Sequence, residues 1–173
     1  MYFFYFDSSA LAKGYIQEKG TVIVEWILEN TSEKQWRVLM LGLLETISIF
    51  VRKKNSGLIS ETVFQSTLRT FTNDFLDNER VFKVEATNDL CVAAAPLIQK
   101  YSINATDALV LHTARGLAAV EREDGNELIL VTADQRLVTA AKAESLQVIN
   151  PETATLAEVA KLLQPEPPAA QNV

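Results

Sequence analysis

Four acidic side chains occupy similar places in this sequence, each close to the start of a segment with helical character. They are Asp7, Glu45, Asp107 and Asp134. Three of them come directly after, or within one helical turn of, an apolar run that is typical of a buried strand. Because open parallel sheets place their ligands at the carboxyl ends of the strands, these acids are expected to meet at one edge of a sheet, with Asp107 joining them if its helix starts there.

Each acid taken singly has an ordinary explanation as a helix cap. Asp is a favoured N-cap, and the helix dipole stabilises a negative charge in the first turn. Taken together, several carboxylates without Lys or Arg beside them in sequence would repel one another unless a divalent cation lies between them. Mg²⁺ and Mn²⁺ prefer oxygen ligands of this kind. The set therefore predicts a metal site, with Mg²⁺ or Mn²⁺ as the cofactor.

Other chemistry has less support in the sequence. The hydroxyls of Ser9 and Thr132 could orient carboxylates, or they could only cap helices. His112 is the single histidine, and it follows Asp107 by five residues, which turns it about 140° away around a helix. A Ser-His-Asp triad is therefore disfavoured. Without a Gly-x-Gly-x-x-Gly or Walker pattern, a nucleotide cofactor is also unsupported.

The elements that must position these acids alternate between strand and helix. Strands are expected at residues 2–6, 36–41, 81–84, 128–131 and 147–149. Helices are expected at residues 7–17, 21–30, 43–55, 60–76, 88–100, 106–117, 135–143 and 155–163, with a polar loop at 121–126. Strands separated by helices favour parallel pairing with right-handed crossovers. The sequence thus predicts a three-layer α/β domain.

Length and composition limit the possible classes of protein. A chain of 173 residues predicts one domain, residues 1–163, and the proline-rich end, residues 164–173, is expected to be a flexible tail. The net charge of −6 argues against a dedicated nucleic-acid coat protein, but not against an enzyme that meets nucleic acid through metal ions. The lone cysteine, Cys91, excludes an internal disulfide and is expected in the core. We expect a soluble cytoplasmic protein without a membrane span.

Four segments in order are similar to the motifs of PIN-domain nucleases. Residues 5–13, YFDSSALAK, resemble the opening motif, and Glu45 with the following Ile49, Arg52 and Lys53 resembles the second acidic motif. Residues 106–114, TDALVLHTA, resemble the Asp-Ala-Leu helix, and residues 131–137, VTADQRL, resemble the closing motif. The resemblance spans residues 2–151. It departs from the family at Leu41 and Gly42, where Ser or Thr is common, and is loose over residues 58–102.

The resemblance implies a PIN-like domain with a parallel sheet of about five strands and a Mg²⁺- or Mn²⁺-dependent ribonuclease activity. It implies Asp7 and Asp107 as direct metal ligands, with Glu45 and Asp134 acting through water or at a second metal. It also implies a VapC-type toxin that acts on RNA, binds a small antitoxin protein and forms a homodimer.

Two alternatives stay open at this point. One is a catalytically inactive PIN-like module that binds other proteins, and the other is a housekeeping RNA-processing nuclease. The identity of the RNA and the number of metal ions are not determined by the residues.

Overall fold

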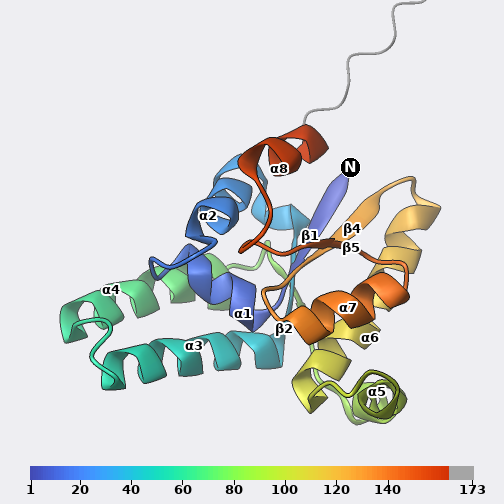
Figure 1. Ribbon diagram of the computed structural model, residues 1–173, viewed down its shortest axis with the longest axis horizontal. Helices are drawn as coiled ribbons and strands as arrows, with labels where there is room; N and C mark the ends of the chain where they lie inside the picture. The colour runs from blue at the N-terminus through green and yellow to red at the C-terminus, as the bar shows by residue number, and fades with distance from the viewer. Residues whose placement is uncertain (164–173) are drawn as a thin grey trace, which may run out of the picture.

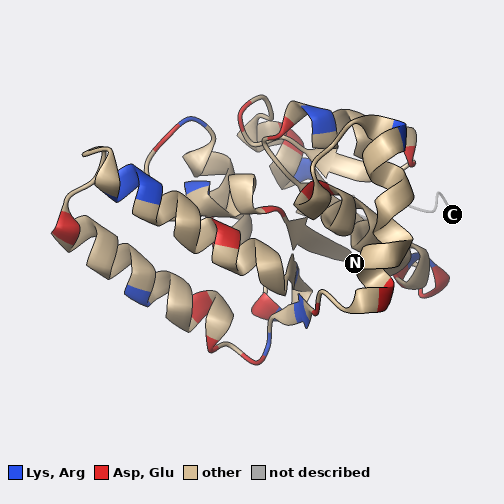
Figure 2. Cartoon of the chain, turned by 90° about the horizontal axis from the view of Figure 1, so that it is seen from below, with Lys and Arg blue, Asp and Glu red and all other residues tan. Residues whose placement is uncertain are grey.

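The computed structural model describes residues 1–163 and shows a central sheet covered by helices on both faces (Figure 1, and seen from below in Figure 2). The five strands lie in the order β3-β2-β1-β4-β5, and every pair is parallel. Their bounds are β1 Tyr2–Phe6, β2 Trp36–Leu39, β3 Phe82–Val84, β4 Glu127–Val131 and β5 Gln147–Ile149. The predicted three-layer α/β class is confirmed. The tail predicted for residues 164–173 lies outside the described part of the chain.

The helices follow the strands in the expected alternation. They are α1 Ser8–Leu11, α2 Thr21–Asn30, α3 Met40–Asn55, α4 Glu61–Phe71, α5 Asn88–Tyr101, α6 Ala105–Glu123, α7 Gln135–Ala143 and α8 Leu156–Leu163. Short 3₁₀ segments cover Ala12–Gly14 and Glu33–Gln35, and a π-helical turn covers Thr72–Leu76. None of the helices within residues 1–163 is long and apolar enough to cross a membrane.

Alternating side chains of the strands form a separate hydrophobic core on each face of the sheet. Phe4 and Phe6 of β1 pack with α1, α2, α3, α4 and α8 on one face. Tyr5, between them, packs with α5, α6 and α7 on the other face. A strand buried on both sides must be apolar at nearly every position, as the aromatic run of β1 is.

The strand register brings the carboxyl ends of the central strands to one level. Phe6 is paired with Val131, and Val131 with Ile149. Just beyond these pairs, the Asp7 N–H donates to the Val131 carbonyl at 3.0 Å, and the Thr132 N–H donates to the Ile149 carbonyl at 3.1 Å. The residue after β1 and the residue after β4 are therefore neighbours, as expected for a parallel sheet.

Several predicted boundaries were wrong. β2 ends at Leu39, and α3 begins at Met40, because the chain passes from strand to helix without a polar loop to mark the change. Glu45 is consequently the sixth residue of α3 and lies in its second turn. The first helix is much shorter than expected, since α1 gives way to a 3₁₀ turn that ends at Gly14.

Two further predictions were wrong, one on the end of α6 and one on the burial of Cys91 in α5. α6 continues to Glu123, so half of the predicted polar loop at residues 121–126 is helical, and its charges reflect a solvated last turn. Cys91 is exposed and does not belong to the core. α5 buries Ala94 and Leu97 against α6, and Cys91 lies on the outward side of the same helix.

Candidate metal-binding active site

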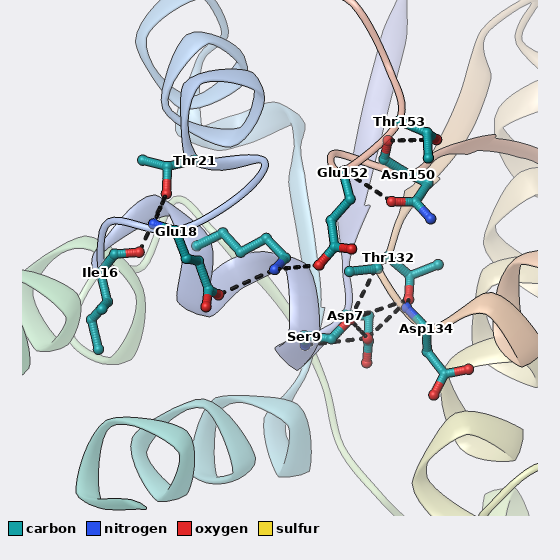
Figure 3. A network of polar contacts seen from close by, with 12 residues as sticks. Asp7, Ser9, Ile16, Glu18, Thr21, Thr132, Asp134, Asn150, Glu152 and Thr153 are labelled. Atoms are coloured by element: carbon teal, nitrogen blue, oxygen red, sulfur yellow. Dashed lines mark hydrogen bonds and ion pairs between the residues drawn. The ribbon is translucent and has the colours of Figure 1, made fainter. Parts of the chain in front are cut away.

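Asp7 is the buried centre of a hydrogen-bonded group at the end of β1 (Figure 3). Its Oδ2 accepts hydrogen bonds from Ser9 Oγ at 2.5 Å and from Thr132 Oγ1 at 3.0 Å. It also accepts from the Ser9 backbone N–H, which makes Asp7 the N-cap of α1. Burial raises the pKa of the Asp7 carboxyl, and the hydroxyls of Ser9 and Thr132 oppose that rise by stabilising its charge.

Asp134 lies beside this group at the start of α7 (Figure 3). Its Oδ1 accepts from the backbone N–H groups of Arg136 at 2.7 Å and Leu137 at 3.1 Å, so Asp134 caps α7. The Asp134 N–H donates to Thr132 Oγ1 at 3.1 Å. The Thr132 hydroxyl therefore links the two acids that follow β1 and β4.

Glu45 reaches the same edge of the sheet from α3. Its Oε1 accepts from Thr106 Oγ1 at 2.7 Å, and its Oε2 accepts from Ser8 Oγ at 3.2 Å. Ser8 directly follows Asp7, and Thr106 directly precedes Asp107. Glu45 is thus held between the chain segments that carry two of the other acids.

Asp107 differs from the other three acids in its hydrogen bonding. The helix α6 is capped by Asn104, whose Oδ1 accepts from the Asp107 N–H at 2.8 Å, so the Asp107 side chain is not the cap. Asp107 is only 6% exposed. Among the buried side-chain oxygens and nitrogens of residues 1–163, only its Oδ2 has no hydrogen-bond partner. Burial, followed by the charges of Asp7 and Asp134, raises its pKa from 3.8 to about 7.

The donor set suits a hard divalent cation. All four side chains offer carboxylate oxygens, which Mg²⁺ and Mn²⁺ prefer, and an unpartnered buried oxygen at Asp107 is the kind of atom that such an ion would satisfy. Among residues 1–163, no group of three or more His, Cys, Asp or Glu side chains is placed so that it could hold a metal ion. The acids nevertheless share one edge of the sheet, and carboxylates of this number and kind fit an ion that keeps several water ligands.

The sequence identified the acids and both hydroxyls at Asp7 but missed the residues that hold Glu45. Ser8 adjoins Asp7 and Thr106 adjoins Asp107. A hydroxyl residue next to a motif acid was therefore the one sequence feature that could have indicated the partners of Glu45. His112 lies elsewhere, as its spacing predicted: it lines a separate cavity of about 330 Å³ with Arg115 and Glu144.

A second polar group lies beside the acids in Figure 3. The ammonium of Lys13, a buried residue, lies 2.7 Å from Glu152 and 3.2 Å from Glu18, and Lys53 lies 2.5 Å from Glu18. These pairs join the 3₁₀ segment Ala12–Gly14, the loop before α2, the end of α3 and the loop after β5. The ammonium of Lys53 is thus paired with Glu18.

Comparison with known proteins identifies the fold but gives no sequence family. The chain matches no family model and no curated protein. It is similar to PAE2754 from Pyrobaculum aerophilum, with a TM-score of 0.58 and 18% identity over 92% of this chain and 96% of the other. It is also similar to a toxin–antitoxin complex from Klebsiella pneumoniae, with a TM-score of 0.52 and 17% identity over 85% and 96% of the two chains.

A third similar structure is FitAcB from Neisseria gonorrhoeae, with a TM-score of 0.55 and 13% identity over 87% of this chain and 99% of the other. At these identities the likeness establishes the fold. The predicted architecture, a five-stranded parallel sheet with helices on both faces, is therefore confirmed, and these solved structures share the fold over most of the chain.

Proposed function

We propose that this protein is a Mg²⁺- or Mn²⁺-dependent endoribonuclease and the toxin of a toxin–antitoxin pair. The observation that carries the proposal is Asp107, a buried carboxyl group with an unpartnered oxygen, whose pKa the charges of Asp7 and Asp134 help to raise. A helix-capping acid has no need of two further acids beside it. A site that binds a cation between carboxylates needs several acids close together.

The residues of the site would act in distinct ways. Asp7 and Asp107 would hold the metal directly, while Glu45 and Asp134 would contact it through water or at a second ion. A bound divalent ion would supply charge that lowers the pKa of a water molecule and neutralises the phosphodiester. Ser9 and Thr132 would fix the orientation of the Asp7 carboxylate through the bonds they already donate to its Oδ2.

A divalent-ion assay tests the enzymatic part of the proposal. The purified protein should cleave structured RNA in Mg²⁺ or Mn²⁺, stop in excess EDTA, and lose activity by orders of magnitude as Asp7→Asn. The matched control is Asp124→Asn, at the exposed end of α6, which should cleave as the parent does. Cleavage that persists in EDTA, or in Asp7→Asn with an unchanged circular dichroism spectrum, would contradict the proposal.

The toxin role is a separate element of the proposal. One of the similar structures is a toxin–antitoxin complex, and the acidic site of this chain would accept an Arg or Lys inserted by a small protein partner. Expression of the protein alone should arrest growth, and co-expression of the partner should restore it. Normal growth together with metal-dependent cleavage would instead favour RNA processing. We also propose a homodimer, and light scattering that gives a monomer at micromolar concentration would refute it.

A further inference from the structure

A small cavity lies next to the acidic site, between the end of α5 and the exposed side of α7. Its volume is about 220 Å³. It is lined by Tyr101, Gln135, Arg136, Thr139 and Ala140. Gln135 and Arg136 directly follow Asp134 at the start of α7, so the cavity adjoins that acid. The Arg136 backbone N–H bonds Asp134, but none of the side chains that line the cavity is assigned a role at the proposed metal site.

Tyr101 is held in place on one wall of this cavity. Its hydroxyl donates to the Glu144 carboxylate. The same carboxylate accepts a hydrogen bond from Lys100 Nζ at 2.8 Å and lies 2.9 Å from Arg115 Nε. The Lys100 ammonium lies 4.8 Å from the centre of the Tyr101 ring. The phenol ring is half-buried and anchored at its tip, so little side-chain entropy remains to be lost when a flat ligand packs on it.

Arg136 stands between this cavity and the carboxylates. Its side chain is 63% exposed, and its guanidinium nitrogen lies 3.9 Å from Asp134 Oδ2. Its charge also reaches Asp107, whose pKa it lowers slightly against the larger effects of burial and the neighbouring acids. An exposed guanidinium in this position faces any phosphate that approaches the acids, and guanidinium groups pair readily with phosphate.

We propose that the cavity is a base-binding subsite, in which Tyr101 stacks on one base of the RNA strand beside the phosphate being cleaved. The inference rests on the proposed ribonuclease function. Arg136 would contact the phosphate between that base and the acids, and Gln135 and Thr139 would offer hydrogen bonds to the base edge. The cavity is smaller than the roughly 300–1,000 Å³ of sites for drug-sized ligands, which suits one flat ring system.

The chemistry of the walls favours a base over a simple ion or an aliphatic group. An aromatic ring and Ala140 offer apolar contact, while an amide, a hydroxyl and a guanidinium offer polar contact around it. Single-stranded nucleic acids are held in this way, by bases stacked on aromatic rings and by basic groups along the backbone. Stacking on an aromatic side chain contributes about 1–3 kcal/mol per base, so its loss should weaken binding about 5- to 150-fold.

The test combines a change in the protein with a change in the RNA. Short RNAs of one sequence are prepared with an abasic ribose at each position near the cut, and kcat/KM is measured in Mn²⁺. For the parent, one abasic position should lower kcat/KM about 5- to 150-fold. Tyr101→Ala should lower it for the intact RNA and be insensitive to that abasic position. Tyr101→Phe keeps the ring but loses the bond to Glu144, so it should stay closer to the parent than Tyr101→Ala does and remain sensitive to that abasic position.

Arg136→Ala provides the second arm. It should weaken cleavage of intact and abasic RNAs alike. It should also reduce the slope of log binding constant against log salt concentration by about 1, as expected for the loss of one phosphate contact. The matched control is Arg69→Ala, on the exposed side of α4, which should change neither quantity. If Tyr101→Ala does not fold, Gln135→Ala takes its place and should alter which base is preferred at the sensitive position.

The outcomes separate this subsite from the proposed enzyme. If the parent cleaves but abasic positions affect the parent and Tyr101→Ala equally, the subsite is refuted and the ribonuclease stands. If the parent cleaves nothing, the ribonuclease is refuted. Fluorescence anisotropy with Asp107→Asn as the binding protein then decides the subsite: a tighter complex with intact than with abasic RNA, lost on adding Tyr101→Ala, supports it, and equal binding overturns it.

Discussion

Replacing Asp107 by Asn should stabilise the metal-free protein, because it removes a charge that the fold disfavours. The native pKa of about 7 exceeds the ordinary value of 3.8 by about three units. At about 1.36 kcal/mol per unit, the full difference would be about 4 kcal/mol. Burial is the largest cause of this difference and the charges of Asp7 and Asp134 add to it; solvent at the sheet edge screens part of the effect, so we expect a gain of about 1–3 kcal/mol at pH 8.

The sign of the effect fixes its pH dependence. A raised pKa means that the native carboxyl group binds its proton more tightly than the unfolded one, so the parent is relatively most stable below pH 4. Its stability relative to Asp107→Asn falls as the pH rises from about 4 through about 7, and then levels off. The gain from the substitution should therefore be near zero at pH 4 and complete by about pH 8.

Urea unfolding followed by circular dichroism, in EDTA at constant ionic strength, measures this difference at each pH. The matched control is Asp89→Asn, an exposed acid in the first turn of α5. It should lose about 0.3–1 kcal/mol at neutral pH, because only a favourable interaction with the helix dipole is removed. Mn²⁺ at about 100 times its Kd should stabilise the parent by about 2.7 kcal/mol and Asp107→Asn by much less.

One result would refute this reasoning. If Asp107→Asn resembles Asp89→Asn, with a loss of stability in EDTA and an unchanged response to Mn²⁺, then Asp107 is an ordinary first-turn acid. The like-charge repulsion inferred from Asp7 and Asp134 would then be absent, and the metal site would have to exclude Asp107.

Three further substitutions test the supports of the site. Thr132→Val should lower stability by about 1–3 kcal/mol, measured by urea unfolding, since Asp7 loses a buried donor, and Thr132→Ser should recover most of it. Lys13→Met should cost a similar amount by leaving Glu152 unpaired, with little change if the pair contributes nothing. Thr106→Val should lower Mn²⁺ affinity in calorimetry while leaving the melting temperature in EDTA within a few degrees, because only the orientation of Glu45 is relaxed.

The parallel topology of the sheet and the closeness of Asp7 to Thr132 could both be predicted from the sequence, because both follow from a single rule. Alternating strands and helices require parallel pairing, and parallel pairing brings the ends of β1 and β4 to the same edge. Nothing about these two residues depends on side-chain detail. The boundaries of the longest elements depend on more than periodicity.

α3 shows why some boundaries could not be predicted. Residues 38–44 are apolar throughout, so the change from strand to helix at Met40 leaves no polar mark in the sequence. The extension of α6 past Leu117 was hidden for the opposite reason, since a solvated final turn has the composition of a loop. The hydrogen bonds from Ser8 and Thr106 to Glu45 depend on how α1 and α6 meet α3, which no local pattern encodes.

The four acids also show how far helix capping explains a cluster of this kind. The capping explanation is correct for Asp7 and Asp134, since both accept backbone N–H groups at the start of a helix. It fails for Asp107, because Asn104 already caps α6 and the buried Asp107 carboxyl group accepts no capping hydrogen bond.

A protein selected for stability alone would keep the two caps and replace Asp107 by an uncharged residue. A destabilising carboxylate that feels the charges of two other acids is what we expect of the proposed metal site, which would function by binding positive charge. Capping and metal binding are thus compatible at Asp7 and Asp134, where one oxygen holds the helix and the charge remains. Asp107 makes no capping bond, so this residue is where the proposed metal site and a set of caps lead to different predictions.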